Sequence, residues 1–168
     1  AQWTNQQAAW GTDENHLTSV GTLSQAAEAE DGQYIKVLND CSITDTVYID
    51  KDVTLDLNGK TVTEGNNIYQ IFYVKSGTLT LTDSAGGAKV ECLGENSGEC
   101  IYVSSGAKLT IHGGRFYSAT GSVFQTDSGT EALITGGDFS TSHNYVVGND
   151  GKLTVSGGNF TAGKWFAI

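Results

Sequence analysis

Apolar and polar residues alternate with a period of two in a short phrase that recurs along the second half of the chain. Successive copies read "GTLTLTD", "GAKLTIHGG", "GTEALITGG" and "GKLTVSGG". Alternation of this period predicts β-strands with one apolar face rather than helices. The copies are 29, 23 and 22 residues apart, counted between the leading glycines Gly77, Gly106, Gly129 and Gly151. A repeat of this length predicts a solenoid, because one unit cannot bury its apolar face without its neighbours.

Aligning the copies predicts three strands in each turn of the solenoid. The first strand places four apolar or small pairs inward: Val47 and Ile49, Phe72 and Val74, Ile101 and Val103, and Phe124 and Thr126. The third strand contributes a column that we expect to stack in the core, namely Phe116, Phe139 and Phe160. Asn-Gly or Gly-Gly pairs recur at one corner, where a sharp bend requires positive φ.

The first 33 residues differ from the repeats. Residues 1–21 are polar without a clear period, and we expect them to be irregular. The phrase "TLSQAAEAEDG" then predicts a short helix, in which Thr22 and Gln25 form a capping box. Because a solenoid needs a cover over its first rung, this helix is expected to lie there. We therefore predict one domain in two parts, an N-terminal segment with a capping helix over residues 1–33 and an all-β, single-stranded parallel β-helix of about five to six rungs over residues 34–168.

Composition narrows the classes of partner and the compartment. Nine basic against nineteen acidic residues give a formal net charge of -10. That charge argues against nucleic acid or an anionic membrane as a partner, because both require Lys and Arg patches. No stretch approaches the length of about 18 apolar residues that inserts into a bilayer. The abundance of Gly, Thr, Ser and Asn predicts an extracellular protein, and the absence of Met leads us to expect a processed piece of a longer chain.

The three cysteines leave two interpretations open. Cys92 and Cys100 bracket the insertion "LGENSGE", and a disulfide between them would close that loop in a secreted protein. The alternative is three reduced, partly buried thiols. Cys41 is expected two rungs from Cys92, beyond the roughly 7 Å over which two Cα atoms can be bridged. We expect no metal site and no cofactor, since a Cys-rich metal site usually needs four ligands.

A longer phrase carries a resemblance to a known family. "VTLDLNGKTVT", which begins at Val53, follows a helix and the phrase "IKVLND", and it precedes the repeated pattern G-x-L-T-I-x-G-G-x-F. This arrangement resembles right-handed parallel β-helix repeat modules of large surface proteins from Gram-positive, often gut-dwelling, bacteria. The resemblance covers residues 22–168. It implies a right-handed coil, a secreted or cell-wall attached parent with neighbouring domains on the same chain, and a role in adhesion or glycan binding.

One outward column predicts a binding surface. Tyr48, Tyr73 and Tyr102 occupy the middle of the first strand on three successive rungs, and Gln125 and Val147 follow. Sugar chains stack on rows of aromatic rings, and polar neighbours supply hydrogen bonds. The two longest insertions leave the same corner and would place four further residues beside the column, namely Asn66, Asn67, Tyr69 and Asn96. The alternative is that tyrosine is simply a good strand former.

Candidate catalytic groups have simpler explanations. An outward column suited to a polysaccharide lyase consists of Lys89, Arg115, Asp138 and Asn159, but opposite charges on adjacent rungs pair across strands. A carboxylate cluster suited to a hydrolase consists of Asp50, Asp52 and Asp56, and its place at a turn predicts solvated side chains.

The three histidines, His16, His112 and His143, lack metal-ligand spacing. The outward threonines, Thr54, Thr80, Thr110 and Thr154, are interrupted by Leu133 and are expected to be ordinary strand residues.

The sequence therefore predicts a non-catalytic extracellular recognition or adhesion module that binds a polysaccharide or a host glycoprotein. The residues expected to bind are Tyr48, Tyr73, Tyr102, Asn66, Asn67, Tyr69, Asn96 and Gln125. Two alternatives stay open at this point. One is an architectural spacer without a ligand, and the other is a small polysaccharide lyase or hydrolase on the same fold.

Overall fold

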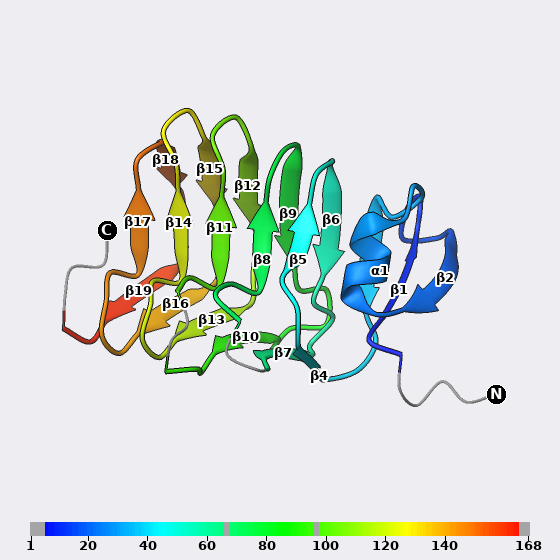
Figure 1. Ribbon diagram of the computed structural model, residues 1–168, viewed down its shortest axis with the longest axis horizontal. Helices are drawn as coiled ribbons and strands as arrows, with labels where there is room; N and C mark the ends of the chain where they lie inside the picture. The colour runs from blue at the N-terminus through cyan, green and yellow to red at the C-terminus, as the bar shows by residue number, and fades with distance from the viewer. Residues whose placement is uncertain (1–5, 66–67, 96–97, 165–168) are drawn as a thin grey trace.

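The computed structural model describes residues 6–65, 68–95 and 98–164, and it shows the predicted β-helix (Figure 1). Three sheets run along the coil. Sheet A contains β1 (Ala8–Gly11), β2 (Leu17–Gly21), β3 (Tyr34–Val37), β6 (Val53–Asp56), β9 (Thr78–Thr82), β12 (Lys108–Ile111), β15 (Glu131–Ile134) and β18 (Lys152–Val155). Sheet B contains β4 (Cys41–Ile43), β7 (Thr61–Glu64), β10 (Lys89–Cys92), β13 (Arg115–Ser118), β16 (Asp138–Thr141) and β19 (Asn159–Ala162). Sheet C contains β5 (Val47–Ile49), β8 (Phe72–Val74), β11 (Ile101–Val103), β14 (Phe124–Thr126) and β17 (Val147–Asn149).

Each turn of the solenoid visits the three sheets in the order C, A, B, and each strand from β3 to β16 pairs in parallel with its counterpart one turn later. Five such turns run from β5 to β19, preceded by the incomplete turn β3–β4. The arrows in Figure 1 show that the coil is right-handed. The predicted fold class is therefore confirmed, because a repeat of three short alternating strands can satisfy its backbone only by bonding to the turns above and below.

The core lies between the three sheets and consists of the predicted inward columns. The inward residues of β5, β8, β11 and β14 are all buried. Phe139 is 1% exposed and lies between two other rings, with centroids 5.1 Å from Phe116 and 4.8 Å from Phe160 and interplanar angles of 7° and 12°. Stacked rings of this kind add to the stabilisation that comes from burying their apolar area.

The corner between sheets A and B requires glycine for a physical reason that Gly137 illustrates. Its φ is 112°, a conformation that residues with a Cβ rarely adopt. A Cβ there would also lie 3.0 Å from Phe139 Cζ and 3.1 Å from the carbonyl oxygen of Gly114. Gly114 and Gly158, at the same corner of the neighbouring turns, have φ of 100° and 101°. The glycine column thus allows each turn to bend tightly over the phenylalanine stack.

The N-terminal end is covered by a helix, as predicted. Helix α1 (Leu23–Glu28) begins at Thr22, whose side chain accepts a hydrogen bond from the Gln25 amide and completes a capping box. Leu23 and two alanines of α1 are buried against the first turn. At the other end of α1, the Lys51 ammonium donates to the carbonyl of Ala29. These contacts attach the helix to the end of sheet C, where it packs mainly against β5.

The expectation of an irregular segment before α1 is wrong for the described residues. β1 and β2 form an antiparallel hairpin, and β1 also pairs antiparallel with β3, so that sheet A continues past the coil. Trp10 is 8% exposed and Ala8 is fully buried. The pattern does not show this hairpin because all four residues of β1 are buried, which removes the alternation that identifies a strand.

Candidate functional site

The three tyrosines that the sequence predicts to form a column lie side by side on sheet C. Tyr48 pairs with Tyr73, Tyr73 with Tyr102, and Tyr102 with Gln125. We call Tyr48, Tyr73 and Tyr102 the tyrosine ladder. The next position of this column is Gly148, not Val147 as expected, because Val147 pairs with Phe124 and is buried.

The rings of the tyrosine ladder are not coplanar. The centroids of Tyr48 and Tyr73 are 5.6 Å apart with an interplanar angle of 46°, and those of Tyr73 and Tyr102 are 5.2 Å apart at 88°. Lys75 Nζ lies 4.0 Å from the centroid of the Tyr48 ring, within the range of a cation–π contact. The ladder is therefore a stepped row of ring faces and edges with one ammonium group over it, rather than a flat platform.

The hydroxyl groups of the ladder differ in what they contact. The Tyr102 hydroxyl donates to Asp127 Oδ1 over 2.6 Å, and this hydrogen bond, together with burial, raises the pKa of Tyr102 to about 12. The Tyr73 hydroxyl accepts from Ser104 Oγ at 3.0 Å. Tyr48 is 46% exposed, and no described residue forms a hydrogen bond with its hydroxyl. Two rings are thus fixed at their tips, and the third remains accessible to a ligand.

The described parts of the two insertions contact each other shortly before β8 and β11 begin. The Gly98 amide donates to the carbonyl of Tyr69 over 2.8 Å, and a Cβ at Gly98 would lie 2.4 Å from Tyr69 Cε1. The Tyr69 side chain is 60% exposed. Three of the predicted binding residues, Asn66, Asn67 and Asn96, lie outside the described residues.

Cys92 and Cys100 are free cysteines in the structure, both fully buried at the foot of the second insertion. Their side chains are close enough to interact, and the hydrogen bond between the two thiols, together with burial, raises the pKa of the Cys92 thiol. Cys100 Sγ also lies 3.2 Å from the carbonyl oxygen of Tyr117. The two thiols are neighbours, as the proposed loop-closing bond requires, and the oxidation of the pair stays a prediction.

Three of the four side chains in the charged column on sheet B pair with one another. Lys89, Arg115, Asp138 and Asn159 lie in register on successive turns. Arg115 Nε lies 3.6 Å from Asp138 Oδ2, and Asn159 Nδ2 donates to Asp138 Oδ1 over 2.8 Å. These side chains are exposed, so their pairing contributes little to stability. Within the described part of the chain, no three His, Cys, Asp or Glu side chains converge as a metal site.

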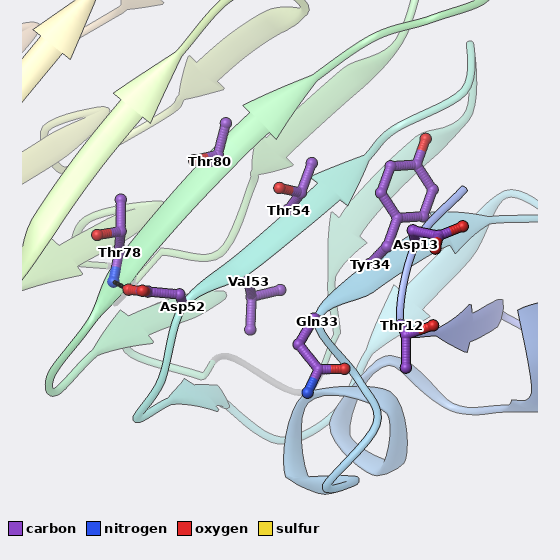
Figure 2. Close-up of a pocket in the computed structure, with 9 residues that line it drawn as sticks. All are labelled: Thr12, Asp13, Gln33, Tyr34, Asp52, Val53, Thr54, Thr78 and Thr80. Atoms are coloured by element: carbon purple, nitrogen blue, oxygen red, sulfur yellow. Dashed lines mark hydrogen bonds between the residues drawn. The ribbon is translucent and has the colours of Figure 1, made fainter. Parts of the chain in front are cut away.

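One hollow on the described surface was not predicted by the sequence. It is a cleft of about 490 Å³ between the turn of the β1–β2 hairpin and the outward face of sheet A (Figure 2). We call it the hairpin cleft. The residues that line it are Thr12, Asp13, Gln33, Tyr34, Asp52, Val53, Thr54, Thr78 and Thr80. Tyr34, Thr54 and Thr80 form one outward row on β3, β6 and β9, and this row is the start of the threonine column that the sequence assigned to ordinary strand residues.

A buried carboxylate, Asp56, accepts a hydrogen bond from the cleft residue Tyr34. The expectation of a solvated Asp56 is therefore wrong. Asp56 is fully buried. Its Oδ2 accepts from Ser84 Oγ at 2.6 Å and from the Tyr34 hydroxyl at 3.2 Å, while its Oδ1 accepts from the amides of Ser84 and Asn58. Burial alone would raise the pKa of Asp56, but these hydrogen bonds hold it below the usual value.

The hydrogen bonds of Asp56 could have been predicted from the sequence. Asp56 directly precedes "LNG", and an aspartate before an Asn-Gly bend commonly accepts amide hydrogen bonds from the turn. The hairpin cleft has no such signal, because its two walls are separated in sequence and meet only through the pairing of β1 with β3.

No protein-family model, no curated protein and no solved structure matches this chain.

Proposed function

We propose that this β-helix is a non-catalytic extracellular recognition module that binds a glycan along the tyrosine ladder. The observation that supports this proposal is the register of Tyr48, Tyr73 and Tyr102 on three successive parallel strands. Parallel pairing fixes their spacing at about 4.8 Å per turn, so that the ladder presents a regular row to an extended polymer. The extracellular location and the adhesive role, for a polysaccharide or a host glycoprotein, belong to the same proposal.

The stepped geometry suggests how a sugar chain would be held. The partly exposed rings would contact C–H faces of the sugar, mainly at Tyr48, which is the most exposed of the three. Gln125, in register with Tyr102, adds an amide group at the end of the row. Lys75 adds a single positive charge beside Tyr48. Each contact is weak, so affinity would depend on the simultaneous engagement of several turns.

The surface is suited to binding rather than catalysis. Hydrolysis by the usual route needs two carboxyl groups about 5–10 Å apart on either side of a glycosidic bond. Next to the ladder, the Asp127 carboxylate already accepts a hydrogen bond from the Tyr102 hydroxyl. The alternative lyase column is paired internally through Arg115 and Asp138. Because these charged side chains already pair within the protein, they favour recognition over the enzymatic alternative.

A glycan array tests the proposal with the wild-type protein and the single variants Tyr48→Ala, Tyr73→Ala and Tyr102→Ala. We expect each variant to bind about tenfold more weakly to the glycans that the wild type retains, since the loss of one ring contact of about 1.4 kcal/mol corresponds to that factor. Tyr117→Ala is the matched control. Tyr117 is a half-buried outward tyrosine on sheet B whose hydroxyl lies 2.8 Å from Ser142 Oγ.

Two results would contradict the proposal. Binding that is unchanged in the ladder variants would reject the surface. A wild-type protein that retains no glycan would reject the function and favour the architectural spacer.

A further inference from the structure

We propose that the hairpin cleft is a second ligand site, and that it takes a neutral sugar unit. The cleft lies on sheet A, whereas the tyrosine ladder lies on sheet C. The inference therefore does not depend on the proposed function of the ladder. The hairpin cleft has a volume of about 490 Å³. This volume is within the range of small-molecule sites, which is about 300–1,000 Å³.

Hydroxyl groups with spare hydrogen-bonding capacity line the cleft. The side chains of Thr54, Thr78 and Thr80 form no hydrogen bond with any described residue, and all three residues are only half-buried. Figure 2 shows Thr54 and Thr80 rising from neighbouring strands. Because a hydroxyl both donates and accepts, such a row complements a ligand that itself carries hydroxyl groups at regular spacing.

The cleft also contains acceptors that the protein has already oriented. Asp52 Oδ1 accepts from the Thr78 amide over 2.8 Å, which fixes the carboxylate at the edge of the cleft (Figure 2). Gln33 Nε2 donates to the carbonyl of Glu30 over 2.9 Å, so its amide oxygen remains available as an acceptor. Groups that are fixed before binding lose little conformational entropy when a ligand arrives.

One aromatic side chain is held in place by the buried carboxylate. The Tyr34 hydroxyl donates to Asp56 Oδ2, and burial together with the Asp56 charge raises the pKa of Tyr34 to about 12. Lys36 Nζ, 3.8 Å from the same carboxylate oxygen, balances its charge. Tyr34 therefore stays neutral and fixed at its tip, while its half-buried ring belongs to the wall of the cleft. A fixed ring beside free hydroxyls is a common arrangement for binding a sugar ring.

The charges around the cleft select against anionic sugars. Two carboxylates line it, Asp13 and Asp52, and no Lys, Arg or His is among its lining residues. Asp13 is contacted by His16 Nδ1 at 2.7 Å. A uronic acid or a sulfated sugar would meet repulsion from Asp52 here, with no cation among the lining residues to bind its charge. This property also separates the hairpin cleft from the tyrosine ladder, which has Lys75 beside it.

An NMR titration of the ¹⁵N-labelled protein tests the site. The probes are cellotetraose, xylotetraose and chitotetraose as neutral oligosaccharides, and tetragalacturonate as the anionic contrast. We expect at least one neutral probe to shift the amide resonances of Thr54, Thr78 and Thr80 at millimolar concentration, and tetragalacturonate to leave them unchanged. The inference is overturned if no neutral probe shifts these amides, or if the anionic probe shifts them as strongly.

Variants then locate the site and separate it from the ladder. The double variant Thr54→Val with Thr80→Val keeps the side-chain shape but removes two hydroxyls, and we expect at least fivefold weaker binding. Thr154→Val is the matched control, because Thr154 lies in the same outward column five turns from Tyr34 and outside the cleft. It should bind as the wild type does.

A ring variant and a ladder variant complete the test. Tyr34→Ala should reduce binding strongly, whereas Tyr34→Phe, which keeps the ring, should bind nearly as well as the wild type. Tyr73→Ala should leave these shifts intact whether or not the ladder binds a glycan. Equal binding by the threonine double variant and the wild type would place the probe elsewhere and contradict the inference.

Discussion

At the N-terminal end of the coil, α1 packs against β5, and the β1–β2 hairpin continues sheet A beyond β3. Toward the C-terminus, β17, β18 and β19 are each the last strand of their sheet among the described residues. The exposure of side chains differs accordingly. Leu23 in α1 is 1% exposed, whereas Val155 in β18 is 41% exposed and Phe160 in β19 is half-buried.

The comparison shows that position along the coil decides what an identical side chain contributes. In a solenoid each turn contacts only its neighbours, so stability is a sum of turn and interface terms. A residue in an inner turn has neighbours above and below, and among the described residues one in the last turn has a neighbour on one side only. We therefore expect local unfolding to begin at β17–β19 and the turns next to α1 to unfold last.

The largest expected difference separates Phe139→Ala from Phe160→Ala, two identical changes in one column. Phe139 is buried between two stacked rings, so truncation should lower the free energy of unfolding by about 3–5 kcal/mol. Phe160 stacks on Phe139 alone among the described residues, and we expect less than half of that loss, about 1–2 kcal/mol. Chemical denaturation followed by circular dichroism measures both.

Equal losses of unfolding free energy at the two positions would contradict the expected difference between an inner turn and the last described turn. They would mean that the last turn is covered as thoroughly as the inner ones. Phe116→Ala serves as a second inner control and should behave like Phe139→Ala, since Phe116 is also 1% exposed.

The next largest effect concerns the N-terminal end, at Asp56. Asp56→Ala removes a buried carboxylate that accepts four hydrogen bonds and leaves the amides of Ser84 and Asn58 without their acceptor. We expect a loss of about 3 kcal/mol in the free energy of unfolding. Thermal and urea denaturation at neutral pH measure it.

The pH dependence at Asp56 has a definite sign. Because the pKa of Asp56 is lowered in the folded state, its contribution is fully present above the ordinary Asp pKa of about 3.9 and is lost as the pH falls through the folded value. The wild type should thus lose stability below about pH 4 more steeply than Asp56→Ala does. Parallel acid profiles of the two proteins would contradict this assignment.

The smallest expected effect concerns helix α1, which covers the first turn of the coil. Thr22→Ala removes the side chain that accepts the Gln25 amide in the capping box, which should cost about 1 kcal/mol. Thr22→Ser keeps the oxygen and should be close to the wild type. Hydrogen exchange of the α1 amides should increase in Thr22→Ala, whereas exchange in β14 and β17 should not change.

The coil itself could be predicted because its signals are local and repeated. The alternation in β9, β12 and β15 gives the inward face, and the glycine corners give the bends. The tyrosine ladder follows from the same register. The error at Val147 arose because that strand offers a glycine, Gly148, at the outward position, so no side chain marked the column.

The sequence by itself determined the sheets, the inward columns, the capping box and the neighbours within each column, because each depends on a short period repeated one turn later. The angles between the tyrosine rings, the burial of Asp56, the β1–β2 hairpin and the hairpin cleft were decided only by tertiary structure. These features depend on contacts between segments without a common pattern, such as Tyr34 with Asp56 and β1 with β3. Side-chain packing and long-range pairing fix such contacts, and a residue pattern does not encode them.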